Sequence, residues 1–317
     1  MKALVYKAKN APLAYEDIDL PALCAGEVRV ELKAAALNHR DNWITKGLYP
    51  GIRENIILGS DGAGVLEGRE VILNPNIGWG ENQRFPAPDY HMLGMPTHGT
   101  FAQAIHVARD RVHDKPAHLS IEQAALPLPA DRLRTVLSLP PAGRREGADQ
   151  RRRWGVAFVR PPVATAAGAE VHVTSGSAEK IERAKALGAA GGANYRDDGW
   201  ARSLKAASGG FDVIIDSAGG PGFADLVRLT RRGARIGLYG GTLGNWQNVS
   251  PQTVFFNQID ILGSTMGSDQ DFTEMLAFVN QHRIEPVVDR RYALADGNQA
   301  LAQMDAGSQF GKIVLTI

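Results

Sequence analysis

The fold is decided by the stretch Glu170-Val171-His172-Val173-Thr174-Ser175-Gly176-Ser177 and the residues that follow it. Residues 170–174 are rich in β-branched side chains, which predicts a strand, and residues 175–177 are typical of a turn. Apolar residues then recur at helical spacing up to Gly188, which predicts a helix that ends there. A strand, a turn and a helix in this order form the second half of a βαβ unit, whose first half normally carries a glycine-rich phosphate loop.

The segment before this unit, residues 131–163, does not carry such a loop. Its 33 residues include eight arginines and four prolines, a composition unlike a buried strand and a glycine turn. Reading the codons of residues 144–155 one base later permits Gly-Glu-Lys-Val-Leu-Ile-Asn-Gly-Ala-Gly-Gly, which is a buried strand with a Gly-x-Gly-Gly turn. One hypothesis is that the segment is partly translated out of frame, and the alternative is a genuine arginine-rich surface loop. In the printed chain, Gly155 and Val156 stand at the place of the phosphate loop.

The bulk composition narrows the class of protein. A chain of 317 residues is long enough for two domains, and its formal net charge of +1 gives no indication of a nucleic-acid, membrane or acidic partner. The single cysteine, Cys24, excludes a disulfide framework and a multi-cysteine metal site. Met1 leads directly into a strand-like segment, without a signal peptide or an 18-residue apolar run, so we expect a cytoplasmic protein.

The pattern of elements changes near residue 117. Residues 1–116 read as β-rich, with period-two alternation in residues 28–32 and dense turn chemistry. From residue 117 onwards strands alternate with helices, which predicts an α/β fold with a doubly wound parallel sheet. The expected elements of this part are strands at 211–215, 234–239 and 259–263 and helices at 222–229 and 272–280. A last strand at 311–315 is expected to return to the first domain.

Several motifs in this order resemble a known family. They are Leu37-Asn38-His39-Arg40-Asp41-Asn42-Trp43, Gly47-Leu48-Tyr49-Pro50, Leu58-Gly59-Ser60-Asp61-Gly62-Ala63-Gly64, Asp212-Val213-Ile214-Ile215-Asp216-Ser217 and Gly311-Lys312-Ile313-Val314. The chain resembles the medium-chain dehydrogenase/reductase superfamily, specifically its zinc-free quinone oxidoreductase-like branch. The resemblance implies a GroES-like β-rich catalytic domain of residues 1–116, completed by residues 272–317. A Rossmann nucleotide-binding domain of residues 117–271 is inserted between these two parts.

Zinc is not expected in this chain. The resemblance implies that a zinc-dependent relative would have a cysteine near position 39, a His-Glu pair after the Leu-Gly turn, and a later cysteine or aspartate. Here those places hold His39, Ser60-Asp61 and the arginine-rich segment. His91 and His98 could suggest a metal pair, but no thiolate or carboxylate is expected to converge on them. We interpret both as surface or loop-packing histidines.

The end of the second Rossmann strand indicates the cofactor. NAD-binding relatives place an acidic residue there for the ribose hydroxyls. This chain has Ser175, with Ser177 and Lys180 after it, and a hydroxyl with a cation can hold a 2′-phosphate that a carboxylate would repel. Tyr195 and Arg196 follow where relatives add a contact on the adenine side. We therefore predict NADPH, although Lys180 taken alone is equally well explained as a solvated helix residue.

Glycines also mark the ends of later strands, where open α/β sheets bind ligands. Glycine there lets the backbone approach the pyrophosphate and the nicotinamide ribose, and ordinary turn geometry is the alternative explanation. The candidates of this region are Ala218, Gly219, Tyr239, Gly240, Gly241, Thr242, Met266 and Gly267, the last two standing where relatives line the nicotinamide.

Three residues are candidates for catalysis: Asn38, Asp41 and Tyr49, whose counterparts in relatives line the substrate pocket. Hydride transfer leaves negative charge on the acceptor oxygen, so a metal-free site needs hydrogen-bond donors or an electrophilic acceptor. Asn38 and Tyr49 can donate to that oxygen. Asp41 could orient a donor or relay a proton, and the alternative is that it caps a helix that starts near Asn42.

The sequence therefore predicts an NADPH-dependent, zinc-free oxidoreductase that transfers hydride to a quinone or an activated enone or carbonyl. The alternatives are an alcohol or aldehyde dehydrogenase of the same superfamily, or a non-catalytic NADPH-binding protein on this scaffold. Nucleic-acid binding through residues 144–153 is disfavoured by the net charge of +1. Relatives often pair through an edge of the Rossmann sheet, so a homodimer without a nucleic-acid or membrane partner is expected.

Overall fold

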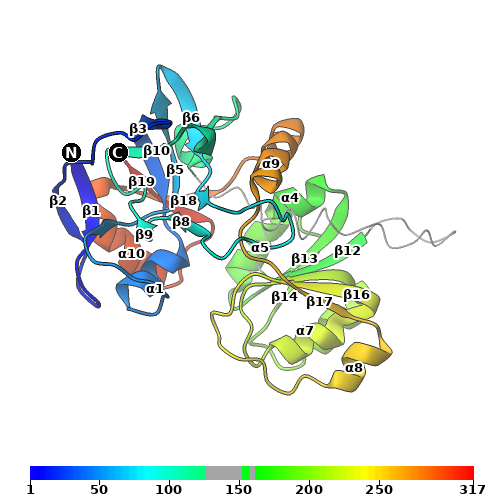
Figure 1. The fold of residues 1–317 in the computed structure, drawn as a ribbon. Helices are drawn as coiled ribbons and strands as arrows, with labels where there is room; N and C mark the ends of the chain where they lie inside the picture. Colours follow the sequence, from blue (N-terminus) through cyan, green and yellow to red (C-terminus); the bar gives the residue numbers. More distant parts are fainter. Residues whose placement is uncertain (126–151, 158–160) are drawn as a thin grey trace. The chain divides into compact units, whose positions relative to one another are not determined.

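The computed structural model describes residues 1–125, 152–157 and 161–317, and for residues 152–157 and 161 it describes the backbone alone (Figure 1). Its contacts divide the chain into two compact units, Met1–Leu128 with Ser268–Ile317, and Pro129–Gly267. The first unit is β-rich and the second alternates strands with helices. The predicted α/β fold class, with a GroES-like part and a Rossmann-type parallel sheet, is confirmed.

The first unit is built on a seven-stranded sheet in the order β11-β6-β5-β3-β19-β18, with β10 also paired to β3. Along β3 (Glu27–Ala36), Val28, Val30 and Leu32 alternate with exposed residues and point into one core. The other strands of this sheet are β5 (Asp61–Leu66), β6 (Arg69–Leu73), β10 (Ala104–Ala108), β11 (Val112–Asp114), β18 (Val288–Ala293) and β19 (Lys312–Thr316). Because β19 pairs antiparallel with β3, the expected return of the last strand to the first domain is confirmed.

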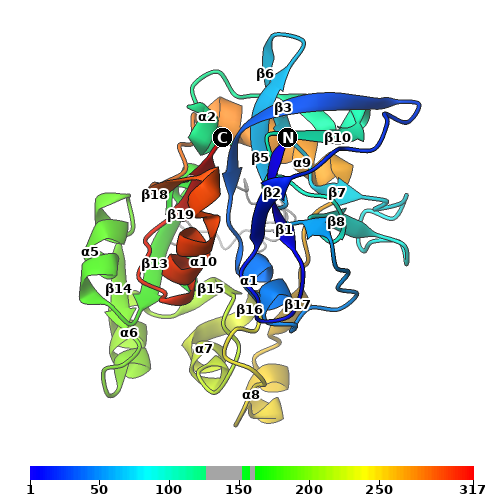
Figure 2. The same cartoon turned by 90° about the vertical axis from the view of Figure 1, so that its left-hand side faces the viewer.

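A second core of the first unit lies under smaller elements. The strands β2 (Ala14–Asp17), β1 (Lys2–Tyr6) and β4 (Ile56–Ile57) form a three-stranded sheet. The helix α10 (Gly297–Asp305) packs beside α1 (His39–Thr45) and β19, as Figure 2 shows. Leu4, Ile44 and Leu301 are among the buried residues that join these elements.

The remaining described elements of this unit are short, apart from one helix. They are β7 (Asn76–Ile77), β8 (His91–Leu93), β9 (Pro96–Thr97), η1 (Arg109–Arg111), α2 (Ile121–Ala124), α9 (Asp269–His282) and η2 (Leu294–Asp296). The helix α2 begins after its N-cap Ser120, whose hydroxyl accepts a hydrogen bond from the backbone N–H of Gln123 at 3.2 Å.

The second unit is a six-stranded, fully parallel sheet in the order β14-β13-β12-β15-β16-β17. Its strands are β12 (Arg152–Ala157), β13 (Ala169–Ser175), β14 (Gly191–Asn194), β15 (Phe211–Asp216), β16 (Thr230–Leu238) and β17 (Asp260–Gly263). Its helices are α4 (Pro161–Ala166), α5 (Ala178–Ala186), α6 (Trp200–Ser208), α7 (Phe223–Leu229) and α8 (Pro251–Phe256). The strands and helices predicted from the sequence at 170–187, 211–229 and 259–263 are all present.

The strand β12 comes from the arginine-rich segment. Its backbone pairs in parallel with β13 on one side and with β15 on the other, so Gly155 and Val156 lie inside a central strand rather than in a turn. Residues 158–160, which join β12 to α4, and residues 131–151 of the same segment lie outside the described residues. The choice between an out-of-frame segment and a genuine loop therefore stays open.

Within the described residues, no helix has the length and the apolar character needed to cross a membrane.

Candidate functional site

The candidate acceptor site begins where β3 ends. Asn38 has extended backbone angles and precedes α1 as its N-cap, and its backbone N–H donates to Asp41 Oδ2 at 2.8 Å. A carboxylate at the third position of a helix commonly satisfies the N-cap N–H in this way. The sequence placed the start of this helix near Asn42, and the structure moves it to His39, so Asp41 closes the first turn from inside α1.

Two neighbouring strands bring further polar groups to Asn38. Ala36 of β3 pairs with Asp61 of β5 on one side and with Val314 of β19 on the other. Because strand neighbours lie about 5 Å apart, this register carries the first residues of β5 and β19 to Asn38, two residues beyond Ala36. Asp61 and Lys312 therefore reach one amide from opposite strands.

The amide of Asn38 is hydrogen-bonded at both ends. Its Nδ2 donates to Asp61 Oδ2 at 2.5 Å and to Ser60 Oγ at 3.2 Å. Its Oδ1 accepts from Lys312 Nζ, which also donates to the carbonyl oxygen of Leu37 at 2.7 Å. The short bond to the Asp61 carboxylate is the charge-assisted one, and the longer bond to Ser60 is the weaker of the two.

Asp41 is the most deeply buried acid of this site. Asp41 is 0% exposed, and its Oδ1 has no hydrogen-bond partner among the residues that the structure describes. Burial raises the pKa of the Asp41 carboxyl to about 6, while the backbone N–H of Asn38 and the charges of Arg40 and Lys312 pull in the opposite direction. Asp41 is thus both a helix cap and a carboxyl group that can change protonation near neutral pH.

Tyr49 lies half-buried after α1, and its ring faces the guanidinium of Arg40 at 4.8 Å. Arg40 is itself buried and donates to the carbonyl oxygens of Leu93 and Met95 at 2.9 and 2.8 Å. This stacking fixes the ring of Tyr49 through a cation–π contact. No hydrogen bond joins the Tyr49 hydroxyl to the described part of the chain, so it is available to a ligand.

The donor groups of a metal site are scattered in the described part of the chain. In the described ranges no three His, Cys, Asp or Glu side chains gather as a metal site would require. The two histidines of the candidate pair have other contacts, since His98 Nδ1 accepts from the N–H of Ile57 at 3.2 Å and His91 Nδ1 lies 3.1 Å from the carbonyl oxygen of Asp89.

The carboxyl edge of the parallel sheet in the second unit collects the predicted cofactor residues. Because every strand of this sheet runs in the same direction, the segments that follow the strands meet at one edge. The residues that follow or close these strands there are Ser175, Ser177 and Lys180 after β13, Tyr195 after β14, Ala218 and Gly219 after β15, Tyr239 to Thr242 after β16, and Met266 and Gly267 after β17.

At the ends of β13 and β14 the chain brings a cation and two hydroxyl groups together. Ser175 pairs with Asn194, and the Ser175 hydroxyl accepts from the N–H of Ser177 at 3.2 Å. A Cβ at Gly176 would lie 2.9 Å from the Tyr195 hydroxyl and 2.8 Å from Arg196 Nε. Gly176 thus leaves room for these two side chains beside Ser175, a donor set that fits a phosphate and contains no carboxylate.

The loops after β15 and β16 are held together by their backbones. The buried Asp216 carboxylate accepts from the N–H groups of Ala218 and Gly219 at 3.0 and 2.9 Å. A Cβ at Gly240 would lie 2.6 Å from the carbonyl oxygen of Ser217, so glycine is required there for the approach of the two loops. This contact supports the turn-geometry explanation for Gly240, and its predicted role toward a cofactor stays a prediction.

The fit to a dinucleotide is incomplete at the centre of the sheet. The strand β12 ends at Ala157 and α4 begins at Pro161, and the chain between them reads Phe158-Val159-Arg160, without glycine. A phosphate loop in this position relies on glycine to bring backbone N–H groups to the pyrophosphate. The donor groups at the end of β13 suit a phosphate, whereas the connection after β12 does not suit a pyrophosphate.

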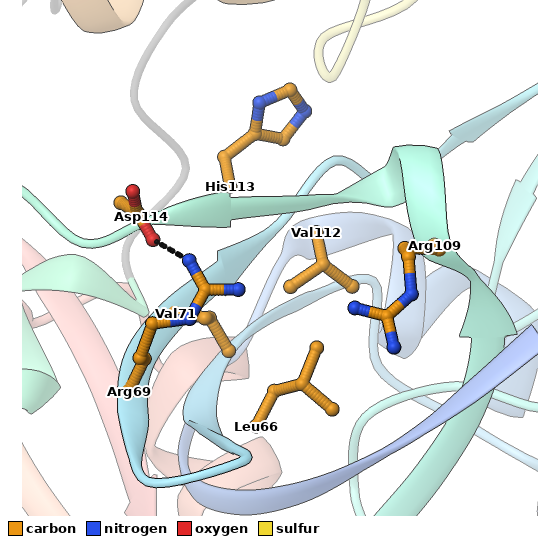
Figure 3. Close-up of a pocket in the computed structure, with 7 residues that line it drawn as sticks. All are labelled: Leu66, Arg69, Val71, Arg109, Val112, His113 and Asp114. Atoms are coloured by element: carbon orange, nitrogen blue, oxygen red, sulfur yellow. Dashed lines mark hydrogen bonds and ion pairs between the residues drawn. The ribbon is translucent and has the colours of Figure 1, made fainter.

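A pocket of about 270 Å³ lies elsewhere in the first unit (Figure 3). Arg69 and Arg109 border an apolar floor, but Arg69 is bonded to Asp114 and Arg109 to Glu67, each at 2.8 Å. Because both guanidinium groups are already paired with carboxylates, this pocket does not offer two available cations. We do not assign it to the reaction.

The sequence reasoning missed Lys312 and Arg40 as members of the site. Arg40 lies in the motif at residues 37–43 and Lys312 in the motif at residues 311–314, and neither motif indicates a role for them. Lys312 lies far from Asn38 along the chain, and only the pairing of β19 with β3 shows their contact. The sequence carries no signal for Arg40 either, because its neighbours His39 and Asp41 are polar and do not predict that it is buried.

Comparisons with known proteins agree with this architecture. Residues 24–117 match the alcohol dehydrogenase GroES-like domain, and residues 162–281 match the zinc-binding dehydrogenase domain. The chain is 31% identical over 344 residues to the zinc-type alcohol dehydrogenase-like protein YogA of Leptosphaeria maculans, covering 96% of this chain and 95% of that protein. The chain belongs to the medium-chain dehydrogenase/reductase superfamily, and it is an oxidoreductase of that superfamily.

Two further similar proteins are a quinone oxidoreductase and an alcohol dehydrogenase. A quinone oxidoreductase of Salmonella typhimurium is 27% identical, over 91% of this chain and 90% of that protein. A crystal structure of an NAD-dependent alcohol dehydrogenase superposes with a TM-score of 0.90 at 32% identity, covering all of both chains. Superfamily members bind NAD or NADP and act on small molecules.

Proposed function

We propose that this protein is an NADPH-dependent, zinc-free reductase of quinones or of activated enones and carbonyls. The observation that carries the proposal is the Asn38 amide, held between Asp61 and Lys312 beside positions where the resemblance implies metal ligands in zinc-dependent relatives. The similarity to a quinone oxidoreductase over nine-tenths of both chains supports it. The residues proposed for catalysis are Asn38, Asp41 and Tyr49.

Asn38 is proposed to donate to the acceptor oxygen. One of its amide hydrogens is held by the Asp61 carboxylate, and the other makes the longer bond to Ser60. An acceptor oxygen can replace Ser60 as the partner of this second hydrogen, and the Tyr49 hydroxyl supplies a further donor. A bound nicotinamide cofactor would supply the hydride, and donors aimed at the oxygen stabilise the negative charge that develops there.

Asp41 is proposed to make the hydrogen bonding of Asn38 depend on pH. Its pKa of about 6 allows the buried carboxyl to hold a proton under mildly acidic conditions. Because its Oδ2 is bonded to the N–H of Asn38, a change of protonation also alters the anchor of the residue that donates to the acceptor. Asp41 therefore acts on the acceptor through Asn38.

NADPH is the proposed cofactor. Ser175, Ser177, Lys180, Tyr195 and the exposed Arg196 provide hydroxyls and cations at the end of β13, where a carboxylate would favour NADH. Ala218, Gly219, Tyr239, Gly240, Gly241, Thr242, Met266 and Gly267 are proposed to line the rest of the cofactor along the same sheet edge. Gly155 and Val156 lie within β12, shortly before the connection to α4, and are proposed to lie near the cofactor from that position.

The test is NADPH oxidation by the purified chain, with 1,4-benzoquinone or an α,β-unsaturated ketone as acceptor. Turnover with NADPH above NADH, unchanged by a chelator, is the expected result. The Asn38→Ala variant is the control for non-enzymatic reduction, since it should retain the fold and lose the donor. Equal rates in the variant and the wild type would refute the proposal.

A second candidate is an alcohol or aldehyde dehydrogenase. The relatives at 31% and 32% identity carry alcohol dehydrogenase names, one of them NAD-dependent, which is the specific reason to test it. Oxidation of primary and secondary alcohols with NAD, stimulated by added zinc, would favour this candidate over the reductase. A non-catalytic protein would show cofactor binding with neither activity.

A homodimer is proposed through the free edge of the parallel sheet. Among the described strands, β17 pairs with β16 alone, and Phe255, Phe256 and Leu262 near it are 58%, 73% and 38% exposed. An edge strand beside exposed apolar side chains is a surface that a second copy can cover. Light scattering should give twice the chain mass, and a monomer would refute this pairing.

The cytoplasm is the proposed location. Cys24 is exposed and unpaired, which suits a reducing compartment. Residues 1–116 with 272–317 are proposed as the catalytic domain and residues 117–271 as the nucleotide-binding domain. Limited proteolysis near both junctions, with cofactor-dependent protection of the second fragment, would test these limits.

A further inference from the structure

We propose that Lys312 is a positioning residue that fixes which end of the Asn38 amide faces the acceptor. The inference rests on the proposed function, because it assigns how the donor of that reaction is oriented. Lys312 is half-buried at the start of β19, at the far end of the chain from Asn38. It does not have to touch substrate or cofactor to perform this role.

The orientation of the amide follows from the chemistry of its two partners. A lysine ammonium group can only donate hydrogen bonds, and an ionised carboxylate can only accept them. Lys312 Nζ lies at one end of the Asn38 amide and the Asp61 carboxylate at the other. The amide oxygen must therefore face Lys312 and the nitrogen must face Asp61, whereas an amide without such partners can be placed either way.

Lys312 is held in place by a second bond. Its Nζ also donates to the carbonyl oxygen of Leu37 at 2.7 Å, the residue before Asn38. The ammonium group thus bridges the backbone and the side chain of adjacent residues. Movement of Lys312 away from the amide would leave the Leu37 carbonyl without this donor, so the two bonds restrain each other.

Loss of Lys312 would allow the Asn38 amide to turn over. A reversed amide presents its oxygen, in place of its nitrogen, to the acceptor. Oxygen beside the negative charge that develops on the acceptor would repel it, whereas a correctly placed donor stabilises it. The side chain of Asn38 would remain present while its contribution to the reaction fell.

The charge of Lys312 also acts on Asp41. The charged groups around Asp41 are Arg40 on the same helix, Asp61 on β5 and Lys312 on β19, and of these Lys312 and Arg40 lower the pKa of Asp41 while Asp61 raises it. Removing the Lys312 charge should move the Asp41 titration to higher pH. A role limited to packing would leave this titration unchanged.

The experiment compares Lys312→Met with Lys312→Arg, which keeps a donor-only cation, and with Lys2→Met as a matched control. Lys2 is a lysine at the start of another strand, β1, and its Nζ lies 2.7 Å from Asp17 Oδ2, away from Asn38. The first readout is solvent exchange of the Asn38 side-chain amide hydrogens in the cofactor-free protein, measured by NMR and assigned with Asn38→Ser. Lys312→Met should exchange about tenfold faster, as expected for the loss of roughly 1.4 kcal/mol of restraint, and Lys312→Arg should restore protection.

Activity gives the second readout. Lys312→Met should lower kcat with quinone about tenfold at an unchanged KM for NADPH, since a misplaced donor affects the transition state more than binding. Unchanged amide exchange in Lys312→Met would overturn the inference, as would a fall in Tm with normal kcat. If Lys312→Met does not fold, Lys312→Gln serves in its place, because a glutamine amide can accept as well as donate and no longer fixes the Asn38 amide, so it must produce the same faster exchange.

The two proposals can fail separately. Absence of quinone reduction by the wild type would refute the proposed function, while the amide exchange would still decide the role of Lys312. Normal quinone reduction with an unaffected Asn38 amide in Lys312→Met would leave the function standing and refute the positioning role.

Discussion

The polar site at Asn38 and the carboxyl edge of the parallel sheet are built in different ways. At Asn38, side chains that precede or begin β5 and β19 hold the side-chain amide, and Asp41 of α1 accepts from the backbone N–H of the same residue. At the sheet edge, glycine allows close approach to the backbone, by the Ser217 carbonyl oxygen at Gly240 and by the Tyr195 and Arg196 side chains at Gly176. The contacts of the Asn38 site depend on the register of the strands that carry the side chains. The contacts of the sheet edge depend on glycine at the turns where the chain is approached closely.

This difference explains why one region is complete and the other is not. The Asn38 network requires only that β3, β5 and β19 pair correctly, and they do. The sheet edge requires glycine after β12 in particular, and the chain has none between Ala157 and Pro161. Changes at the sheet edge should therefore alter cofactor affinity, and changes at Asn38 should alter turnover.

The largest effect is expected from a glycine turn after β12. Replacing residues 158–160 by Gly-Ala-Gly should tighten NADPH binding by about a thousandfold, because two charge-assisted backbone bonds contribute roughly 2 kcal/mol each. Fluorescence titration of NADPH measures the change, and replacement by Ser-Ala-Ser is the matched control. Equal affinity of the two variants would show that the turn after β12 does not limit binding.

At the acceptor site, Asn38→Ala should lower kcat with quinone by about a hundredfold, the usual effect of losing one donor to a developing oxyanion. Steady-state kinetics with NADPH binding measured in parallel checks this, since NADPH affinity should not change. Ser60→Ala removes the weaker partner of the same amide. We expect it to stay within about threefold of the wild type, because it leaves the Asp61 anchor in place; a larger loss would contradict the proposed exchange of Ser60 for the acceptor.

Asp41→Asn should remove a pH dependence of stability. Since burial raises the pKa of Asp41 from 3.8 to about 6, its contribution to folding is present below pH 3.8 and is lost as the pH rises through 6. The wild type should therefore lose roughly 3 kcal/mol relative to Asp41→Asn between pH 3.8 and 7.5. Urea unfolding at both pH values measures this, and parallel pH profiles for the two proteins would contradict it.

The smallest effect is expected at the end of β13. Arg196→Ala should raise the KM for NADPH about tenfold, because one charge-assisted contact to a 2′-phosphate is lost, and should leave the KM for NADH unchanged. Arg202→Ala, on the exposed face of α6, is the matched control. An equal effect of Arg196→Ala on both cofactors would place Arg196 away from the 2′-phosphate.

Periodicity predicted most of the elements and missed those with unusual composition. The strands β13 and β15 follow from their apolar, β-branched runs, and α5 from its helical spacing. The strand β14 reads Gly191-Gly192-Ala193-Asn194, which carries no strand signal, because parallel pairing with β13 and not side-chain preference holds it. The strand β16 begins at Thr230, four residues before its predicted start, where the sequence Arg231-Arg232-Gly233 suggests a turn.

The sequence by itself determined the class of fold, the superfamily and the residue types of the site, because periodicity and short motifs are local properties of the chain. Tertiary structure alone decided that Lys312 and Asp61 meet at Asn38, since residues so far apart in sequence are joined only by strand register. It also decided that Asp41 is wholly buried, which is what raises its pKa. Burial and register arise from the packing of the whole unit, and no local stretch of sequence contains them.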